Sequence, residues 1–377
     1  MIKRIAYLCV MILMVLPLTG CWDYIPISQI TIVSGITIDK DQASNEYQLA
    51  FEIYDVKSSS KDEGVKPKII DSTGTTIFEA IRNAKSKLSN KLYFGAAQVI
   101  VVNESIAKEG MKPIIDFFLR DKELRETTKL VISQEKSAKD ILTSEYTDEK
   151  IISTQIDSII TENAKVTLST VNSSLYQTYN ILKSEEISLV LPAFKNNKKN
   201  NITITEANGI AIFKEDKLKG YLFPEETKYY SFVVNEVEGG VLAFENINSD
   251  IKKISLEIVS NKTRLSYTYT DNKIKMIVEP KVNVHLGEIE GYFNSTDEKQ
   301  IQKLEETTGM LLGENISSVI KKVQTKYQTD IFGFGSYINK KKPKLWNKLS
   351  SNWNEIFSNL EVEVKPKIVI KNTSQIR

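Results

Sequence analysis

Both cysteines of this 377-residue chain, Cys9 and Cys21, lie within its first 21 residues, and this placement is the strongest constraint on the fold. The chain after Cys21 therefore has no thiol for a disulfide, a zinc site or a nucleophile. Its composition, 41% hydrophobic and 26% charged, is typical of globular proteins. We expect the packing of apolar cores to hold the fold together, in two or three domains for this length.

Residues 1–20 have the layout of a secretory signal peptide. Lys3 and Arg4 precede an apolar run over residues 5–16, which is too short to cross a bilayer. The Leu-Thr-Gly-Cys sequence that ends at Cys21 resembles the lipobox of bacterial lipoproteins, in which the thiol is diacylated and the chain is cut just before it. Two acyl chains are enough for stable anchoring. The resemblance implies a mature chain that begins at Cys21 and is tethered outside the cytoplasmic membrane; an uncleaved anchor or an ordinary signal peptide is the alternative.

Charge and histidine content argue against two classes of function. The 50 Lys and Arg residues nearly balance the 48 Asp and Glu residues, so the chain lacks the basic excess typical of nucleic-acid binding. Its one histidine, His285, falls on the polar face of a strand pattern and is expected to be exposed and non-catalytic. We expect no enzyme activity, no cofactor and no metal site; a hydrolase that uses carboxylates alone is a minor alternative.

The region 21–200 alternates between strand and helix patterns. Thr76 and Glu79 have the spacing of a capping box, and Pro113 can begin a second helix. A domain break near residue 145 would divide this region in two. The expected strands are 27–38, 47–56, 98–102, 127–133 and 188–192, with a loop at 57–68 and helices at 76–90, 113–119, 148–163 and 168–182.

The region 201–377 has a different pattern, beginning after the wholly polar run 195–201, which we expect to be a solvated linker. A long helix is expected from a capping box at Ser295 and Glu298 to about residue 328, and Pro366 should interrupt a final edge strand at 361–371. The other expected elements are strands at 202–213, 217–223, 251–260, 264–270 and 273–286, and a helix at 346–360. The whole pattern predicts a multi-domain α+β fold with mixed and antiparallel sheets covered by helices.

The segment 324–335 departs from simple periodicity. Gly333 and Gly335 alternate with aromatic residues beyond the long helix, which indicates a backbone turn or the close approach of another element. Its spacing is not that of a dinucleotide-binding loop. We expect Gln324, Asp330, Gly333, Gly335 and Trp346 to form either a structural turn, with Phe332 and Phe334 packed inward, or an interaction site.

An ordered set of motifs closely resembles the C subunits of spore germinant receptors, the Ger(x)C lipoproteins of endospore-forming bacteria. The motifs are Leu-Thr-Gly-Cys-Trp-Asp at 18–23, Gly-Ile-Thr-Ile-Asp at 35–39, Thr-Ile-Phe-Glu-Ala-Ile-Arg at 76–82, Leu-Tyr-Phe-Gly at 92–95, Gln-Val-Ile at 98–100, Phe-Phe-Leu-Arg-Asp at 117–121, Gly-Ile-Ala-Ile-Phe at 209–213, Lys-Leu-Lys-Gly at 217–220, Asp-Ile-Phe-Gly-Phe-Gly at 330–335 and Trp346. The resemblance implies three α+β domains, a position on the outer face of the spore inner membrane, partnership with an A and a B subunit in nutrient sensing, and no enzymatic activity or cofactor.

A solute-binding lipoprotein that captures a small ligand directly is the alternative from another functional class. Such proteins usually consist of two βαβ-type lobes around a hinge. The strand-rich second half of this chain does not alternate in that way, so the sequence favours the receptor subunit.

Overall fold

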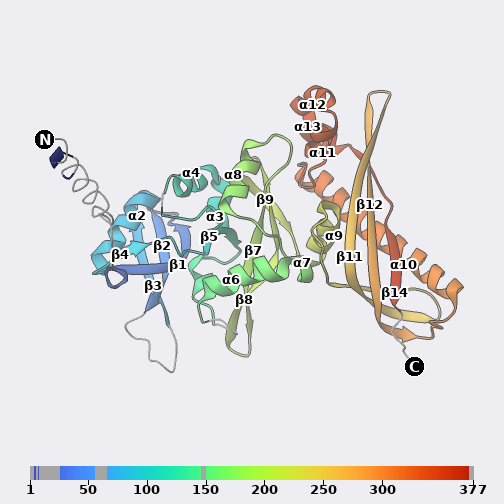
Figure 1. Cartoon of the computed structure of the whole chain (residues 1–377), viewed down its shortest axis with the longest axis horizontal. Helices are drawn as coiled ribbons and strands as arrows, with labels where there is room; N and C mark the ends of the chain where they lie inside the picture. Colours follow the sequence, from blue (N-terminus) through green and yellow to red (C-terminus); the bar gives the residue numbers. More distant parts are fainter. Residues whose placement is uncertain are drawn as a thin grey trace.

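The computed structural model describes residues 4, 5, 7, 26–55, 66–121, 123–145 and 150–372. Cys21 and the predicted lipobox lie outside the described residues. Two β-sheets, each covered by helices, lie one after the other along the long axis of the molecule (Figure 1). The first described strand is at one end, and the sheet that contains the C-terminal strands is at the other.

The first sheet has nine strands in the order β3-β2-β1-β5-β6-β7-β8-β9, with β4 beside the start of β1. Its central strands β1, β5, β6 and β7 run parallel, and the flanking pairs are antiparallel, so the sheet is mixed. The strands are β1 (Ile30–Lys40), β2 (Tyr47–Asp55), β3 (Lys66–Gly74), β4 (Lys91–Tyr93), β5 (Val99–Asn103), β6 (Lys129–Ser133), β7 (Val190–Lys199), β8 (Ile202–Lys214) and β9 (Lys217–Leu222).

Helices cover both faces of this sheet because its central strands are apolar on both sides. In β5, Ile100 and Val102 face one core, whereas Val99 and Val101 face the other. The first core is closed by α2 (Ile77–Asn83), α3 (Glu104–Glu109), α4 (Lys112–Arg120) and α8 (Leu175–Lys183). The second is closed by α5 (Lys139–Leu142), α6 (Ile152–Ser158) and the π-helix η4 (Ile159–Asn163); the short elements η2 (Ile27–Gln29), η3 (Ala84–Lys87) and α7 (Ala164–Thr167) join the others.

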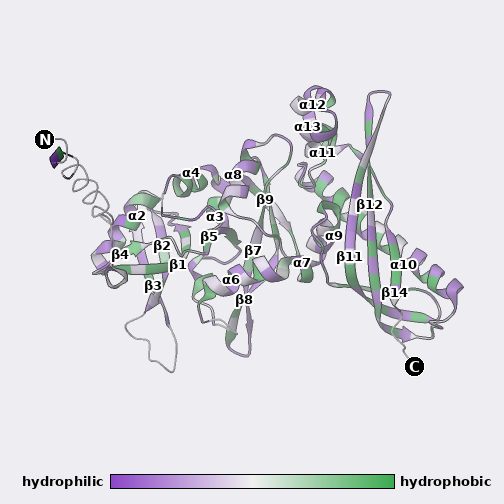
Figure 2. Ribbon diagram, viewed as in Figure 1, coloured by the Kyte–Doolittle hydropathy of each residue, from purple (hydrophilic) through white to green (hydrophobic). Residues whose placement is uncertain are grey.

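The second sheet is built on a long hairpin, β11 (Ile251–Thr270) and β12 (Lys273–Gly291), with β10 (Val241–Glu245) beside β11. Buried and accessible residues alternate along β12, and Figure 2 shows the corresponding change of hydropathy along the strands. Two strands from the end of the chain, β13 (Glu361–Val364) and β14 (Lys367–Asn372), pair in parallel with successive parts of β12. Pro366 separates them, as predicted.

The long predicted helix, α10 (Glu298–Lys322), packs on the second sheet together with α9 (Pro224–Val234). It begins with Asp297 as its N-cap, and not with the predicted Ser295. A Cβ atom at Gly313 would lie 3.2 Å from Cδ of Pro366, so the glycine lets α10 approach the break between β13 and β14. The chain continues through η5 (Val323–Tyr327), α11 (Phe334–Lys341), α12 (Pro343–Leu349), η6 (Ser350–Asn352) and α13 (Trp353–Ser358).

The predicted linker at 195–201 is wrong. These residues are the end of β7 and the turn of the β7–β8 hairpin, so one sheet continues across both predicted boundaries, near 145 and near 200. Asn200 and Asn201 both have positive φ values, 52° and 65°, which suits the tight turn of a hairpin. The strands here are polar because the hairpin extends beyond the core. The α+β fold class, with mixed sheets and a long helix near the C-terminus, is confirmed.

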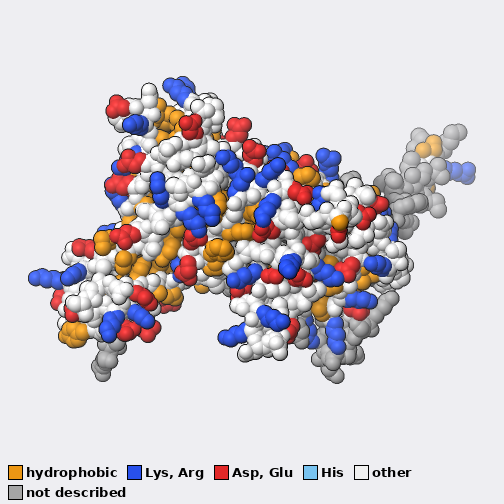
Figure 3. Space-filling view, turned by 180° about the vertical axis from the view of Figure 1, so that it is seen from behind, with side chains coloured by type: hydrophobic (Ala, Val, Ile, Leu, Met, Phe, Trp, Pro, Cys, Tyr) orange, Lys and Arg blue, Asp and Glu red, His pale blue; other side chains and the backbone are white. Residues whose placement is uncertain are grey.

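The surface carries charges of both signs. On the face shown in Figure 3, Lys and Arg side chains are interspersed with Asp and Glu side chains, in keeping with the nearly balanced composition. His285 is half-buried on β12 opposite Glu257, on the face away from the buried Val284 and Leu286.

Candidate functional site at the joint of the two sheets

The carboxylate of Asp330 organises the turn that follows the long helix. It is 1% exposed and accepts hydrogen bonds from the backbone N–H groups of Phe332 (2.9 Å), Gly333 (3.0 Å) and Gly335 (2.8 Å). The indole Nε1 of Trp353 donates a fourth, at 3.1 Å. Because the first N–H groups of a helix have no partner within it, this carboxylate caps the start of α11.

Burial raises the pKa of Asp330 to about 6, and its hydrogen bonds act in the opposite direction. The four groups that contact the carboxylate are all N–H donors, which match the ionised form. This arrangement uses the charge to hold the turn in place and does not present the carboxylate to a ligand.

The two glycines serve different purposes. Gly333 has φ of 76°, in the left-handed region that favours glycine. At Gly335 space is limiting, because a Cβ atom would lie 2.5 Å from the carbonyl oxygen of Glu186 and 2.8 Å from Cη2 of Trp346. The turn therefore packs directly against Trp346 and against the segment that contains Glu186.

Gln324 fixes the other side of the turn. Its Nε2 donates to the carbonyl oxygens of Phe357 (2.9 Å) and Leu360 (2.8 Å), which joins η5 to the end of α13. Phe332 and Phe334 are buried and stack on each other with ring centroids 5.5 Å apart. The structure thus brings the predicted site residues into one buried cluster, in which Gln324, Asp330 and Trp346 are at most 6% exposed. Their predicted role as an interaction site stays a prediction.

This turn docks on the segment between α8 and β7, which belongs to the first sheet. The backbone N–H of Ser188 donates to the carbonyl oxygen of Asp330 at 2.7 Å. Nearby, Nδ2 of Asn339 donates to Oε1 of Glu186 at 2.5 Å. The cluster around Asp330 therefore forms the joint between the two helix-covered sheets.

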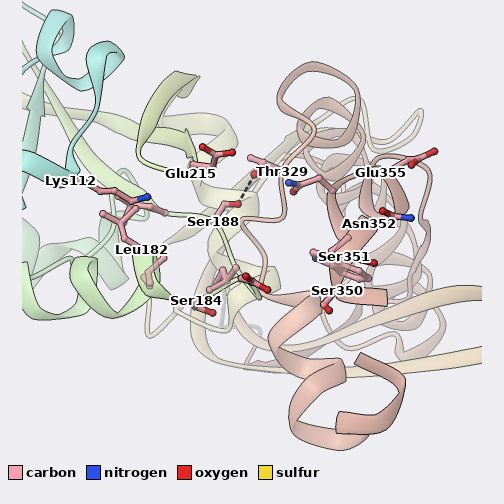
Figure 4. A pocket seen from close by; sticks show the side chains of 16 residues that line it. Lys112, Leu182, Ser184, Ser188, Glu215, Thr329, Ser350, Ser351, Asn352 and Glu355 are labelled. Atoms are coloured by element: carbon pink, nitrogen blue, oxygen red, sulfur yellow. Dashed lines mark hydrogen bonds between the residues drawn. The ribbon is translucent and has the colours of Figure 1, made fainter. Parts of the chain in front are cut away.

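A hollow of about 650 Å³ opens beside this joint (Figure 4). Ser188 and Thr329 meet there through their hydroxyl groups. The charged side chains Glu215 and Glu355 come from opposite walls, one from the β8–β9 turn and one from α13. The remaining lining residues are largely polar and include Lys112, Ser184, Glu185, Ser350, Ser351, Asn352 and Asn354. In the part of the chain that the structure describes, no three His, Cys, Asp or Glu side chains are grouped to hold a metal ion.

Two further buried carboxylates were missed by sequence reasoning. Glu52 on β2 is 0% exposed and accepts from the backbone N–H groups of Ile152 (2.8 Å) and Ser153 (3.0 Å) at the start of α6. Asp39 on β1 accepts from the N–H of Ala138 (2.7 Å) at the start of α5. Burial raises the pKa of both carboxyl groups. The acidic residue between the apolar Phe51 and Ile53 is the signal that could have indicated a buried carboxylate at Glu52.

Among the described helices, none has both the length and the hydrophobicity needed to span a lipid bilayer.

The two mixed sheets and their joint define a multi-domain α+β protein, and comparison with solved structures identifies the same fold elsewhere. The structure titled "Crystal Structure of the GerBC protein" matches with a TM-score of 0.61 over 90% of this chain and 97% of that chain, at 21% sequence identity. This match shows the shared fold.

Sequence comparisons identify the family. Residues 23–196 match the model described as "Spore germination protein N-terminal domain", and residues 208–374 match "Spore germination B3/ GerAC like, C-terminal". Three similar proteins of Bacillus subtilis (strain 168) are spore germination proteins KC (25% identical, covering 99% of this chain and 97% of that protein), B3 (26%, 94% and 94%) and A3 (28%, 98% and 98%). The chain belongs to the Ger(x)C family of spore germination proteins, which confirms the resemblance seen in its motifs.

Proposed function

We propose that this protein is a non-catalytic, lipid-anchored subunit of a spore germinant receptor, needed for nutrient-triggered germination through contacts with the A and B subunits. The observation that carries the proposal is the match to spore germination proteins along nearly the whole chain, in both the N-terminal and the C-terminal family models. Cys21, acylated on its thiol, holds the protein on the outer face of the spore inner membrane.

The buried acidic groups support a non-catalytic role. Asp39, Glu52 and Asp330 are the charged residues most deeply buried in the described chain, and each accepts backbone N–H bonds at the start of a helix. A catalytic acid or base must instead lie within hydrogen-bond reach of a substrate. These three carboxylates are therefore structural.

Direct capture of a solute is the less favoured alternative because the two parts of the molecule share a strand. Ile210 and Ile212 of β8 belong to the core of the second sheet, whereas Ala211 and Phe213 of the same strand belong to a core of the first. A solute-binding protein closes two lobes about a hinge made of a few loop residues. A strand buried between two cores resists that motion.

The anchor is tested by Cys21→Ala in the full-length gene. We expect the variant protein to leave the membrane fraction almost entirely, since two acyl chains supply the attachment. We also expect spores to germinate more slowly by about tenfold or more with the cognate nutrient, and a tagged variant to lose the A and B subunits that the tagged wild type co-purifies. Cys9→Ser, which changes the cysteine inside the signal peptide, is the matched control and should behave as wild type. Full membrane retention of the Cys21→Ala protein would refute the anchor.

A further inference from the structure

Two aromatic side chains are exposed at the end of the molecule where the described chain begins. Phe78 on α2 is 54% exposed and Tyr93 on β4 is 38% exposed. Figure 1 shows α2 and β4 together at this end, far from the hairpin β11–β12. Exposed aromatic groups with cations beside them are typical of surfaces that lie in a membrane interface.

Strand pairing places these residues close to the start of the folded body. β4 runs parallel to the first residues of β1, with Lys91 beside Ile30 and Tyr93 beside Ile32. Paired strands lie about 4.8 Å apart. In addition, Nδ2 of Asn90 donates to the carbonyl oxygen of Ser28 at 3.1 Å. The exposed pair therefore lies on the part of the body nearest to the N-terminal segment.

The distance from Cys21 to the body is short. Five residues, 22–26, lead from Cys21 to Pro26, and five residues span at most about 18 Å when fully extended. If Cys21 is acylated as proposed above, the body cannot move far from the bilayer. The end of the body that carries Phe78 and Tyr93 is then the one that the tether holds against the lipid.

The charges around this surface suit an anionic lipid. The guanidinium of Arg82 lies 4.9 Å from the centre of the Phe78 ring, and Lys85 is exposed on the next turn. Within the described residues, neither cation is paired with a carboxylate. The nearby Glu79 carboxylate is turned back to the N–H of Thr75 (2.8 Å), and Glu123 pairs with Lys91.

A hollow of about 250 Å³ lies beside Phe78, Arg82 and Lys85. Phe78, Arg82 and Lys85 border it, and apolar residues line it further in: Ile81, Leu92 and Phe94. Asp121 also lines the hollow, and its carboxylate accepts from the backbone N–H of Glu123 at 2.8 Å. Cations at the rim and an apolar interior match a phosphate headgroup followed by an acyl chain.

We propose that the end of the molecule that carries Phe78, Arg82, Lys85 and Tyr93 docks on anionic bilayer lipid and sets the orientation of the protein on the membrane. The inference rests on the proposed anchor at Cys21. It adds a second, non-covalent contact that fixes which end of the molecule faces the lipid and directs the hairpin β11–β12 away from it.

Tryptophan scanning with brominated lipid tests this orientation. The full, acylated protein is reconstituted into vesicles of phosphatidylglycerol and phosphatidylethanolamine, and the variants Phe78→Trp and Tyr93→Trp retain an aromatic side chain. The control is Tyr292→Trp, at a residue that is 75% exposed just beyond β12. We expect brominated acyl chains to quench the added emission at positions 78 and 93 at least twofold, and to leave that at 292 unchanged. Adding Arg82→Gln and Lys85→Gln to Phe78→Trp should reduce the quenching.

The outcomes separate the two proposals. Equal quenching at positions 78, 93 and 292 by a protein that still floats with the vesicles would overturn the docking surface and leave the anchor intact; a membrane-embedded protein partner would then be the occupant to examine. A protein that does not float with the vesicles would refute the anchor, and the docking surface with it.

Discussion

At the scale of single residues, buried carboxylates connect distant parts of the chain. Asp39 and Glu52 lie on strands of the first sheet and accept N–H groups at the starts of α5 and α6, about 100 positions later in the sequence. Asp330 does the same for α11 over a shorter separation. Burying a charge is costly unless hydrogen bonds replace its water, and unpaired N–H groups at a helix start supply them.

Asp330→Asn tests the electrostatic contribution of this residue. The folded pKa, about 6, is raised above the unfolded value near 3.8, so the folded state binds this proton more tightly than the unfolded chain. Protonation therefore stabilises the fold, and that contribution is lost as the pH rises from about 4 through 6. At about 1.4 kcal/mol per pKa unit, we expect it to reach roughly 3 kcal/mol.

Urea unfolding of both proteins between pH 4 and pH 7 measures the effect. The free energy of unfolding of the wild type should fall more steeply over this range than that of Asp330→Asn. Asp39 and Glu52 are present in both proteins, so their own contributions cancel in the difference. Parallel curves for the two proteins would contradict the raised pKa.

The sequence indicated the turn beside Asp330, but it did not indicate the contacts that buried carboxylates make with residues far away in the chain. Gly333 and Gly335 beside Asp330 indicated a turn because the signal lies within a few residues. Glu52 gave no comparable indication of its partners, because Ile152 and Ser153 reach it only through the fold. A pattern within one segment cannot specify a contact between two segments that are far apart in the chain.

At the scale of elements, strands and helices with regular periodicity were predicted well, but several elements were missed, among them α9, β3 and β10. In α9, the consecutive residues Tyr230, Ser231, Phe232 and Val233 are all buried, since the helix packs on several sides, so no amphipathic period exists to detect. β10 lies at a sheet edge and is only five residues long. β3 also lies at a sheet edge and is rich in polar residues, which resemble a loop. The polar run at 195–201 was interpreted as a linker for the same reason.

Two helical glycines offer a matched test of how tightly the elements pack. An exposed Gly→Ala change in a helix normally stabilises it by up to about 1 kcal/mol. At Gly309 of α10, the nearest atom to an added Cβ is 3.7 Å away, an ordinary contact. At Gly335 of α11, the same atom would lie 2.5 Å from a backbone oxygen.

We therefore expect Gly309→Ala to be neutral or slightly stabilising and Gly335→Ala to lower the free energy of unfolding by about 1–3 kcal/mol. Chemical denaturation followed by circular dichroism gives both values. Equal effects of the two substitutions would show that α11 has more freedom at the joint than the contact with Glu186 allows.

At the scale of the whole molecule, β8 joins the two sheets because it packs into the cores of both. Its side chains alternate between a core of the first sheet and the core of the second, so neither core is complete without this strand. Tyr327 adds a second link, because its hydroxyl donates to the carbonyl oxygen of Tyr221 on β9 at 2.7 Å. The division into domains at 145 and 200 remains a prediction, although the nine-stranded sheet extends across both positions.

Because β8 is buried in the cores of both sheets, we predict that the two sheets unfold together. Hydrogen exchange in increasing urea should give the same midpoint for peptides from β5 and from α10, and Ile212→Ala should lower both midpoints. The lost packing is expected to cost about 2–5 kcal/mol, since Ile212 is 0% exposed. Tyr292→Ala, at an exposed position, should change neither of these two urea midpoints. Two separate midpoints in the wild type would contradict a single cooperative body.

The pairing of β13 and β14 with β12 also determines how late in translation the second sheet can be completed. β12 is complete by Gly291 and already pairs with β11 on one side, but the strands that pair with its other side arrive only with residues 361–372, the last that the structure describes. Until then, β12 presents a row of unsatisfied peptide groups to any nascent or foreign chain nearby. A ribosome that stops before Leu360 releases a polypeptide with an open template for aggregation, so premature termination near the end of this gene should harm the cell more than its small loss of length suggests.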